Sequence, residues 1–143
     1  MVSPHSYLQH SSSRHIHRPE QLVVALSNGT IALYELSLEV MQAPQLRHVG
    51  NFQYYHDSTL VLSLAMDLNS AFTIATLSTG DVSVIDVGMG SATASQIRKA
   101  HGLEVWCSAW KNPDTILTGG DDALLKIWDL RLDKQTPQMV CKR

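Results

Sequence analysis

Residues 118–129 read TGGDDALLKIWD, an apolar run that follows a glycine-rich turn and ends in a Trp-Asp dipeptide. Thr118 lies 17 residues after His101, and Trp128 lies six residues after Asp122. This spacing suits a relay of hydrogen bonds. We predict that the Trp128 indole donates to the Thr118 hydroxyl, which donates to His101, whose other nitrogen donates to Asp122. Each member satisfies the next, so the relay can be buried without an unpaired polar group.

Two earlier segments, 28–35 and 79–86, repeat the turn-and-strand part of this pattern. They begin 51 residues apart, and the second begins 43 residues before Asp122. Their turns hold Asn and Thr in place of Asp, and Tyr34 and Ile85 stand in place of Trp. The relay is therefore absent from these two units, and we expect apolar packing to hold them instead.

The opening His, the Gly-Asp turn and the closing Trp-Asp together resemble the WD-repeat family, whose repeat is about 40–45 residues long. The resemblance implies an all-β fold, a WD-repeat β-propeller. About two and a half to three blades of a ring expected to have seven are visible, in units at about 21–55, 56–99 and 100–143. The first unit lacks a convincing first strand, and the last ends inside its outer strand. The chain is therefore expected to be a piece of a longer propeller or a truncated product, or to need a partner that covers its open edges.

The segments around the motifs are predicted to be strands and loops. The apolar run 60–66 is expected to be an inner strand, with a short buried helix as the competing interpretation. We expect a loop over 37–50 and outer strands at 52–55 and 96–99. Residues 1–20 are rich in Ser and His and are predicted to be a disordered leader. His15 and His17 could chelate a metal weakly, but two histidines without further ordered ligands make a poor site, so a solvated tail is the favoured interpretation.

Composition excludes several classes of function. The net charge is −2, and no Lys/Arg cluster follows any expected strand, which argues against nucleic acid or a membrane surface as partner. No apolar run approaches the roughly 18 residues that span a bilayer. The two cysteines have no metal-binding or disulfide pattern, which fits a reducing, cytoplasmic setting.

Several residues have the chemistry of catalysis. Thr118, His101 and Asp122 contain the groups of a catalytic triad, but the repeat assigns Thr118 to a buried relay, and a catalytic hydroxyl must be open to substrate. Cys107 is expected to be a small buried hydrophobe rather than a nucleophile. Trp106 is expected either to pack between blades or to line the central channel.

Glu104 and Asp121 are the candidate catalytic residues. The loop after His101 and the turn before Asp122 are expected at the same face of the ring, where the two carboxylates could act as acid, base or water-orienting groups. They could equally be solvated loop charges.

Motif order gives a closer resemblance. The stretch 100–106, with Ala-His, Glu and Trp, precedes GGDDALLKIWDLR at 119–131, and LSL and STG lie upstream at 62–64 and 78–80. Together these segments resemble the diphthine methyl esterases of diphthamide biosynthesis.

That family's substrate is methylated diphthine, a modified histidine on translation elongation factor 2. The resemblance therefore implies an ester hydrolase whose partner is translation elongation factor 2. It implies no cofactor or metal, and it carries no catalytic residue over to this chain. The alternatives are a non-enzymatic scaffold that docks proteins on its faces, or an inactive truncated fragment.

Overall fold

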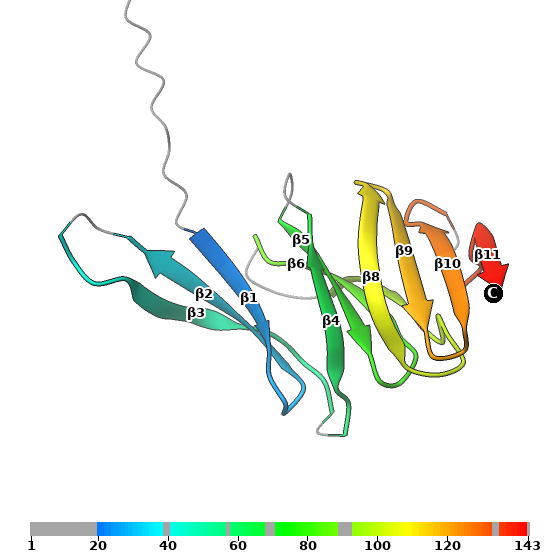
Figure 1. Ribbon diagram of the computed structural model, residues 1–143, viewed down its shortest axis with the longest axis horizontal. Coiled ribbons are helices and arrows are strands. Elements are labelled where there is room, and N and C mark those ends of the chain that lie inside the picture. Colours follow the sequence, from blue (N-terminus) through cyan, green and yellow to red (C-terminus); the bar gives the residue numbers. More distant parts are fainter. Residues whose placement is uncertain are drawn as a thin grey trace, which may run out of the picture.

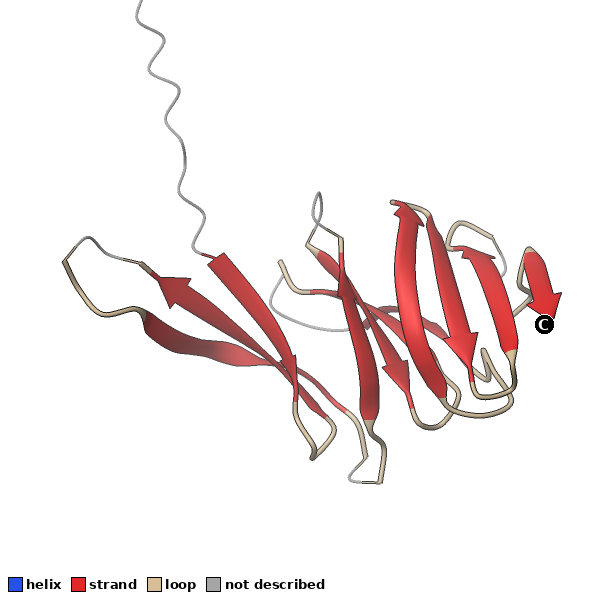
Figure 2. Ribbon diagram, in the orientation of Figure 1, coloured by secondary structure: helices blue, strands red, loops and turns tan. Residues whose placement is uncertain are grey.

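The structure is a computed structural model that describes residues 20–38, 41–56, 58–67, 71–88, 93–132 and 135–142. Strands are the regular elements of these segments, as Figure 2 shows, so the all-β prediction is confirmed. The predicted leader, with His15 and His17, lies outside the described residues apart from Glu20, which begins the first strand.

Eleven strands in the described residues form three antiparallel sheets (Figure 1). Sheet 1 has the order β1-β2-β3, sheet 2 the order β4-β5-β6-β7, and sheet 3 the order β11-β10-β9-β8. The strands of sheet 1 are β1 (Glu20–Ala25), β2 (Thr30–Ser37) and β3 (Gln45–Tyr54). Those of sheet 2 are β4 (Val61–Met66), β5 (Phe72–Leu77), β6 (Val82–Asp86) and β7 (Thr93–Ile97). Those of sheet 3 are β8 (Val105–Asn112), β9 (Thr115–Gly120), β10 (Leu124–Asp129) and β11 (Met139–Lys142).

Two outer strands differ from the sequence prediction. The loop expected over 37–50 is wrong in its second half, because β3 begins at Gln45 and pairs with the far end of β2 at Ser37. This pairing satisfies backbone groups that a loop would leave to solvent. β7 ends at Ile97 rather than reaching Lys99, where φ is 49° and the N–H donates to the Asp81 carboxylate at 2.7 Å.

Consecutive sheets pack side by side through their apolar faces. Figure 1 shows the three sheets following one another, with β4 next to β8 and β1 next to β4. Between sheets 1 and 2, Ile31 packs in one cluster with Ala75 and Ile85. Between sheets 2 and 3, a second cluster includes Val84 and Trp128. The molecule's core is therefore a series of junctions between sheets.

The first two units do rely on apolar packing, as their missing relay predicts. Ile85, which stands at the tryptophan position of the second unit, has no exposed surface. Tyr34 is half-buried and meets His48 edge-on, with ring centroids 5.2 Å apart. Asn28 keeps one function of the missing aspartate, since its side-chain oxygen accepts from the Thr30 N–H at 3.1 Å and closes the turn.

Each of the first two hairpin turns also ties its sheet to the chain segment that leads into the next sheet. Gly29 and Gly80 have φ values of 79° and 86°, which a residue without a Cβ adopts readily. The carbonyl of Gly29 accepts from the Tyr55 N–H at 2.8 Å, and that of Gly80 accepts from the His101 N–H at 3.0 Å. The turns therefore join neighbouring units as well as reversing the chain.

Candidate functional site

The four relay side chains meet where sheet 3 faces sheet 2. Trp128 Nε1 donates to Thr118 Oγ1 at 2.9 Å, and that oxygen lies 2.8 Å from His101 Nε2. The other ring nitrogen, Nδ1, lies 2.8 Å from Asp122 Oδ1. These are the contacts that the spacing predicts, and they join the β9 and β10 strands to the loop before β8.

Asp122 is held by further donors. Its Oδ2 accepts from the Gly102 N–H at 3.1 Å, and its Oδ1 accepts from the Leu124 N–H at 3.2 Å. Desolvation alone would raise the pKa of Asp122. The hydrogen bonds from His101, Gly102 and Leu124 outweigh it and hold this pKa below its usual value. Asp122 therefore anchors the loop that opens the third unit.

The relay has no access to substrate. Thr118 has no exposed surface, His101 is 2% exposed and Trp128 is 3% exposed. Lys126 covers the relay from one side, with its Nζ 5.9 Å from the Trp128 ring centroid and donating to the Ala100 carbonyl at 2.6 Å. The geometry is that of a structural network, since a catalytic hydroxyl must reach a substrate carbonyl.

Glu104 and Asp121 lie side by side at the end of sheet 3 that holds the relay. The Asp121 N–H donates to the Glu104 carbonyl at 2.9 Å, so the two residues are backbone neighbours although they are distant in sequence. Glu104 is half-buried and Asp121 is exposed. Neither side chain has a hydrogen-bond or ion-pair partner within the described part of the chain. Both carboxylates are therefore free for outside ligands, while their catalytic role stays a prediction.

Gly120 allows the backbones of Glu104 and Asp121 to come this close. A Cβ on Gly120 would lie 2.6 Å from His101 Nδ1 and 3.0 Å from the Glu104 carbonyl oxygen. Any side chain at this position would push the turn away from the loop and separate Glu104 from Asp121. The second glycine of the motif thus serves the packing of the turn against the relay, whereas a Cβ on Gly119 would meet Cys107 Sγ at 2.7 Å.

Known proteins resemble this chain both in fold and in sequence. No protein-family model matches it. A chain in the crystal structure of the mitotic checkpoint complex superposes with a TM-score of 0.66 at 21% identity, covering 85% of this chain and 34% of that one. The computationally designed Ika8 protein superposes with a TM-score of 0.64 at 15% identity, over 85% of this chain and 33% of its own. The chain is a partial WD-repeat β-propeller.

Two curated relatives carry names that refer to diphthine, which confirms the resemblance to proteins of diphthamide biosynthesis. A "Diphthine methyltransferase homolog" from Dictyostelium discoideum is 30% identical over 115 residues, which cover 76% of this chain and 30% of that protein. The "Diphthine methyltransferase" of Schizosaccharomyces pombe is 28% identical over 118 residues, covering 81% of this chain and 34% of its own length. The partial propeller thus spans about a third of the length of these relatives.

One expectation for the first strand of sheet 3 is wrong, and a second is narrowed to one of its two alternatives. Cys107 is exposed rather than buried. The side chain shares the face of sheet 3 that looks away from sheet 2, and no described residue covers that face. Trp106 is 56% exposed and does not pack between sheets, so the other expected outcome, that it lines the central channel, stays a prediction. An apolar strand is buried on both faces only when a sheet lies on each side of it.

Asp129 closes the Trp-Asp dipeptide with an ion pair. Arg131 donates through Nε to Asp129 Oδ1 at 3.0 Å and through Nη2 to Oδ2 at 2.6 Å. The pKa of Asp129 is lowered to about 2 by these side-chain hydrogen bonds, by a hydrogen bond from the backbone N–H of Arg131, and by the positive charge of Arg131. The pKa of Arg131 is raised by the same contacts.

This ion pair predicts a pH dependence. Because the pKa of Asp129 is lower in the folded state than the value of about 3.9 in an unfolded chain, the pair stabilises the fold above about pH 4. That contribution is lost as the pH falls towards 2. In urea unfolding at stepped pH, Asp129→Asn should therefore show a shallower fall of unfolding free energy from about pH 4 to about pH 2. Arg131→Met should flatten the same region, and equal slopes in all three proteins would contradict the assignment.

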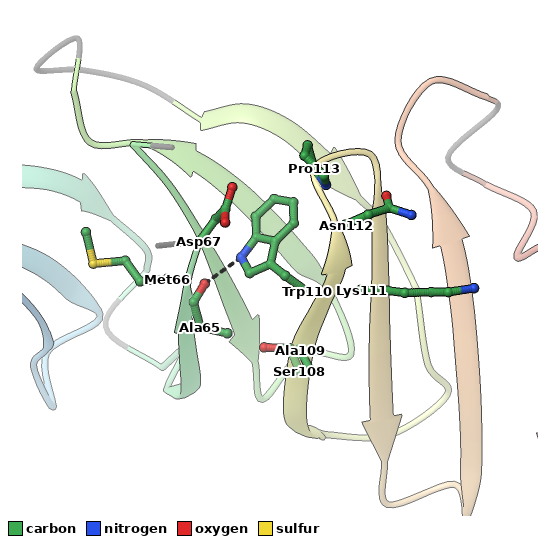
Figure 3. A pocket seen from close by; sticks show the side chains of 9 residues that line it. All are labelled: Ala65, Met66, Asp67, Ser108, Ala109, Trp110, Lys111, Asn112 and Pro113. Atoms are coloured by element: carbon green, nitrogen blue, oxygen red, sulfur yellow. Dashed lines mark hydrogen bonds between the residues drawn. The ribbon is translucent and has the colours of Figure 1, made fainter. Parts of the chain in front are cut away.

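A cavity of 460 Å³ lies at the opposite end of the strands from the relay, between β4 and β8 (Figure 3). Ala65, Trp110 and Pro113 supply apolar surface, the Met66 side chain points away from Trp110, and Lys111 lies at the side of sheet 3. Trp110 Nε1 donates to the Ala65 carbonyl at 2.9 Å and ties the two sheets together. Sequence reasoning missed this cavity. The alternation within β8, which puts Trp110 on the same face as Ser108, is the signal that could have placed Trp110 against sheet 2.

The described segments lack two features. Within them, no group of three or more His, Cys, Asp or Glu residues could hold a metal ion. The same segments contain no helix of the length and apolarity that crossing a membrane requires.

Proposed function

We propose that this partial propeller belongs to a cytoplasmic enzyme that hydrolyses the methyl ester of methylated diphthine on translation elongation factor 2. The similarity to two relatives named for diphthine methyl transfer supports a place in that pathway, although the proposed reaction is hydrolysis. The observation that carries the proposal is the pair of unpaired carboxylates, Glu104 and Asp121, joined through the backbone at 2.9 Å.

Ester hydrolysis needs a base that activates water. In the proposed step, the base takes one proton from water as the water oxygen bonds to the ester carbonyl carbon. The bond from that carbon to the methoxy oxygen then breaks, and the leaving methoxide takes the proton from the base and departs as methanol. The carboxylic acid that forms releases the second water proton to solvent and becomes the carboxylate. Glu104 is half-buried and so partly withdrawn from solvent, which suits a general base, whereas the exposed Asp121 suits a water-orienting role. The buried relay fixes both residues, because Asp122 follows Asp121 directly and His101 opens the loop that contains Glu104.

The test is demethylation of elongation factor 2 that carries methylated diphthine, measured as loss of one methyl ester by intact mass. Glu104→Gln should slow methanol release by about 100-fold, within the range of general-base contributions. Asp121→Asn should slow it less. Asp114→Asn is the matched control, since Asp114 lies in the turn at the other end of β8 and should leave the rate unchanged.

A non-enzymatic scaffold is the second candidate function. It is favoured by the exposed apolar side chains of sheet 3, including Trp106 and Leu125, and by the fold, which hosts many unrelated functions. Unchanged methanol release by both carboxylate variants would remove Glu104 and Asp121 from the mechanism. No methanol release by the wild-type chain would favour the scaffold or an inactive fragment.

A further inference from the structure

The cavity between β4 and β8 lies at the opposite end of the strands from Glu104 and Asp121, and the proposed hydrolysis does not use it. Its two walls belong to sheets 2 and 3, which pack on one another through β4 and β8. The cavity is therefore part of an internal junction between sheets. Its volume of 460 Å³ falls within the range of about 300–1,000 Å³ that ligand pockets have.

Trp110 gives the cavity an aromatic surface. Its Nε1 donates to the Ala65 carbonyl at 2.9 Å, which fixes the orientation of the indole between the two sheets. Met66 holds the equivalent position in sheet 2, since the strand partners of the two residues, Ile116 and Thr73, lie one repeat apart. Met66 packs among the apolar side chains of its own junction, whereas Trp110 is half-buried and lines a cavity.

Acceptor groups lie beside this ring. Figure 3 shows the Asp67 carboxylate next to the Trp110 indole, and Ser108 adds a hydroxyl on the same face of β8. A carboxylate has about four acceptor sites, so Asp67 can accept from a ligand in addition to its contacts within the chain. The ammonium group of Lys111 points away from Asp67 (Figure 3). The cavity thus combines a negative charge with an aromatic surface, which suits a cation.

We propose that this cavity binds an arginine side chain of a partner protein. A guanidinium is planar and stacks on an indole face, and its fork of N–H donors matches a carboxylate. Stacking on Trp110 and donation to Asp67 would use both features of the cavity in one ligand. Free arginine fits less well, because its α-carboxylate needs a cation and Lys111 points away. The proposal does not rest on the proposed function, which concerns the other end of the strands.

The probe that tests this site is a capped arginine, N-acetyl-arginine N-methylamide, added to the chain in solution. Nitrogen–proton correlation spectra should show a saturable shift of the Trp110 indole N–H. The chain has three tryptophans, and the signal that disappears in Trp110→Phe assigns this one. The capped citrulline analogue carries a neutral urea in place of the guanidinium and should bind at least about tenfold more weakly. Equal affinity for the two probes, or no shift of the Trp110 signal, would overturn the proposal.

Asp67→Asn tests the carboxylate, because it removes the charge and keeps the size of the side chain. We expect capped arginine to bind this variant at least about tenfold more weakly. Asp114→Asn is the matched control. Its carboxylate lies in the turn that also contains Pro113 but outside the cavity, so the affinity should not change. Equal losses in the two variants would mean that the probe responds to the general charge of this region, and would overturn the proposal.

Two measurements on the unaltered chain complete the test and do not depend on whether a variant folds. Nuclear Overhauser contacts should join the Cδ protons of the bound probe to the Trp110 ring, and their absence at saturation would contradict stacking. Free arginine should bind more weakly than the capped form. Tighter binding of free arginine would make the cavity a small-molecule site and would overturn the assignment to a side chain of a partner protein.

Discussion

Replacing Thr118 with valine is expected to lower the free energy of unfolding by about 3 kcal/mol, because each buried polar group left without a partner costs about 1–3 kcal/mol. Valine keeps the shape of threonine but removes the oxygen that lies 2.9 Å from Trp128 Nε1 and 2.8 Å from His101 Nε2. Both partners are almost fully buried, so water cannot replace the lost oxygen. Urea unfolding followed by circular dichroism, at one fixed protein concentration, measures the loss.

Thr118→Ser is the matched control. Serine keeps the hydroxyl and loses only a methyl group, so we expect a loss of about 1 kcal/mol. The contrast isolates the hydrogen bonds from the packing. Equal losses in the two variants would mean that the relay adds nothing beyond the volume of its side chains, and that the third unit is held by apolar contacts as the first two are.

The relay could be predicted from sequence because the spacing of its members follows the repeat, and the placing of Thr118 against Trp128 follows from hairpin geometry. In antiparallel strands joined by a tight turn, the register follows from the turn, so the distance along the chain fixes which side chains face each other. The pairing of Lys126 with Thr118 brings Thr118 onto the face of Trp128. The same reasoning located the hairpins around Asn28 and Thr79.

Features that depend on distant parts of the chain could not be predicted. The start of β3 at Gln45 follows from the length of β2, which offers backbone partners as far as Ser37. The predicted burial of Cys107 is wrong because an apolar strand suggests cover on both faces, whereas the described residues cover only one. Local sequence does not record whether a neighbouring sheet is present.

The placement of the candidate carboxylates could be predicted only in part. Motif spacing placed Glu104 and Asp121 at one end of the sheet, and the structure brings their backbones into contact. The close approach depends on Gly120, where a Cβ would collide with the His101 ring. The sequence shows the Gly-Gly pair but not what lies against it, so the reason for the glycine emerges only from the fold.

Replacing Gly80 with alanine is expected to destabilise the chain by at least about 3 kcal/mol, through backbone strain and a clash that cannot relax. The φ of 86° disfavours any residue with a Cβ. The new Cβ would lie 2.5 Å from the His101 carbonyl oxygen and 3.0 Å from that of Leu103. These are backbone atoms, which cannot swing aside, and the Gly80 carbonyl also holds the His101 N–H at 3.0 Å.

The damage should therefore reach beyond the turn of sheet 2 to the relay of sheet 3. Hydrogen exchange measured by mass spectrometry should show faster exchange in the loop around His101 as well as in the turn. Gly102→Ala is the control, since its Cβ would meet nothing within 4 Å and its φ lies outside the left-handed region. We expect that variant to stay within about 1 kcal/mol of the wild type. If Gly80→Ala loses no more stability than Gly102→Ala, the turn does not lock sheets 2 and 3 together.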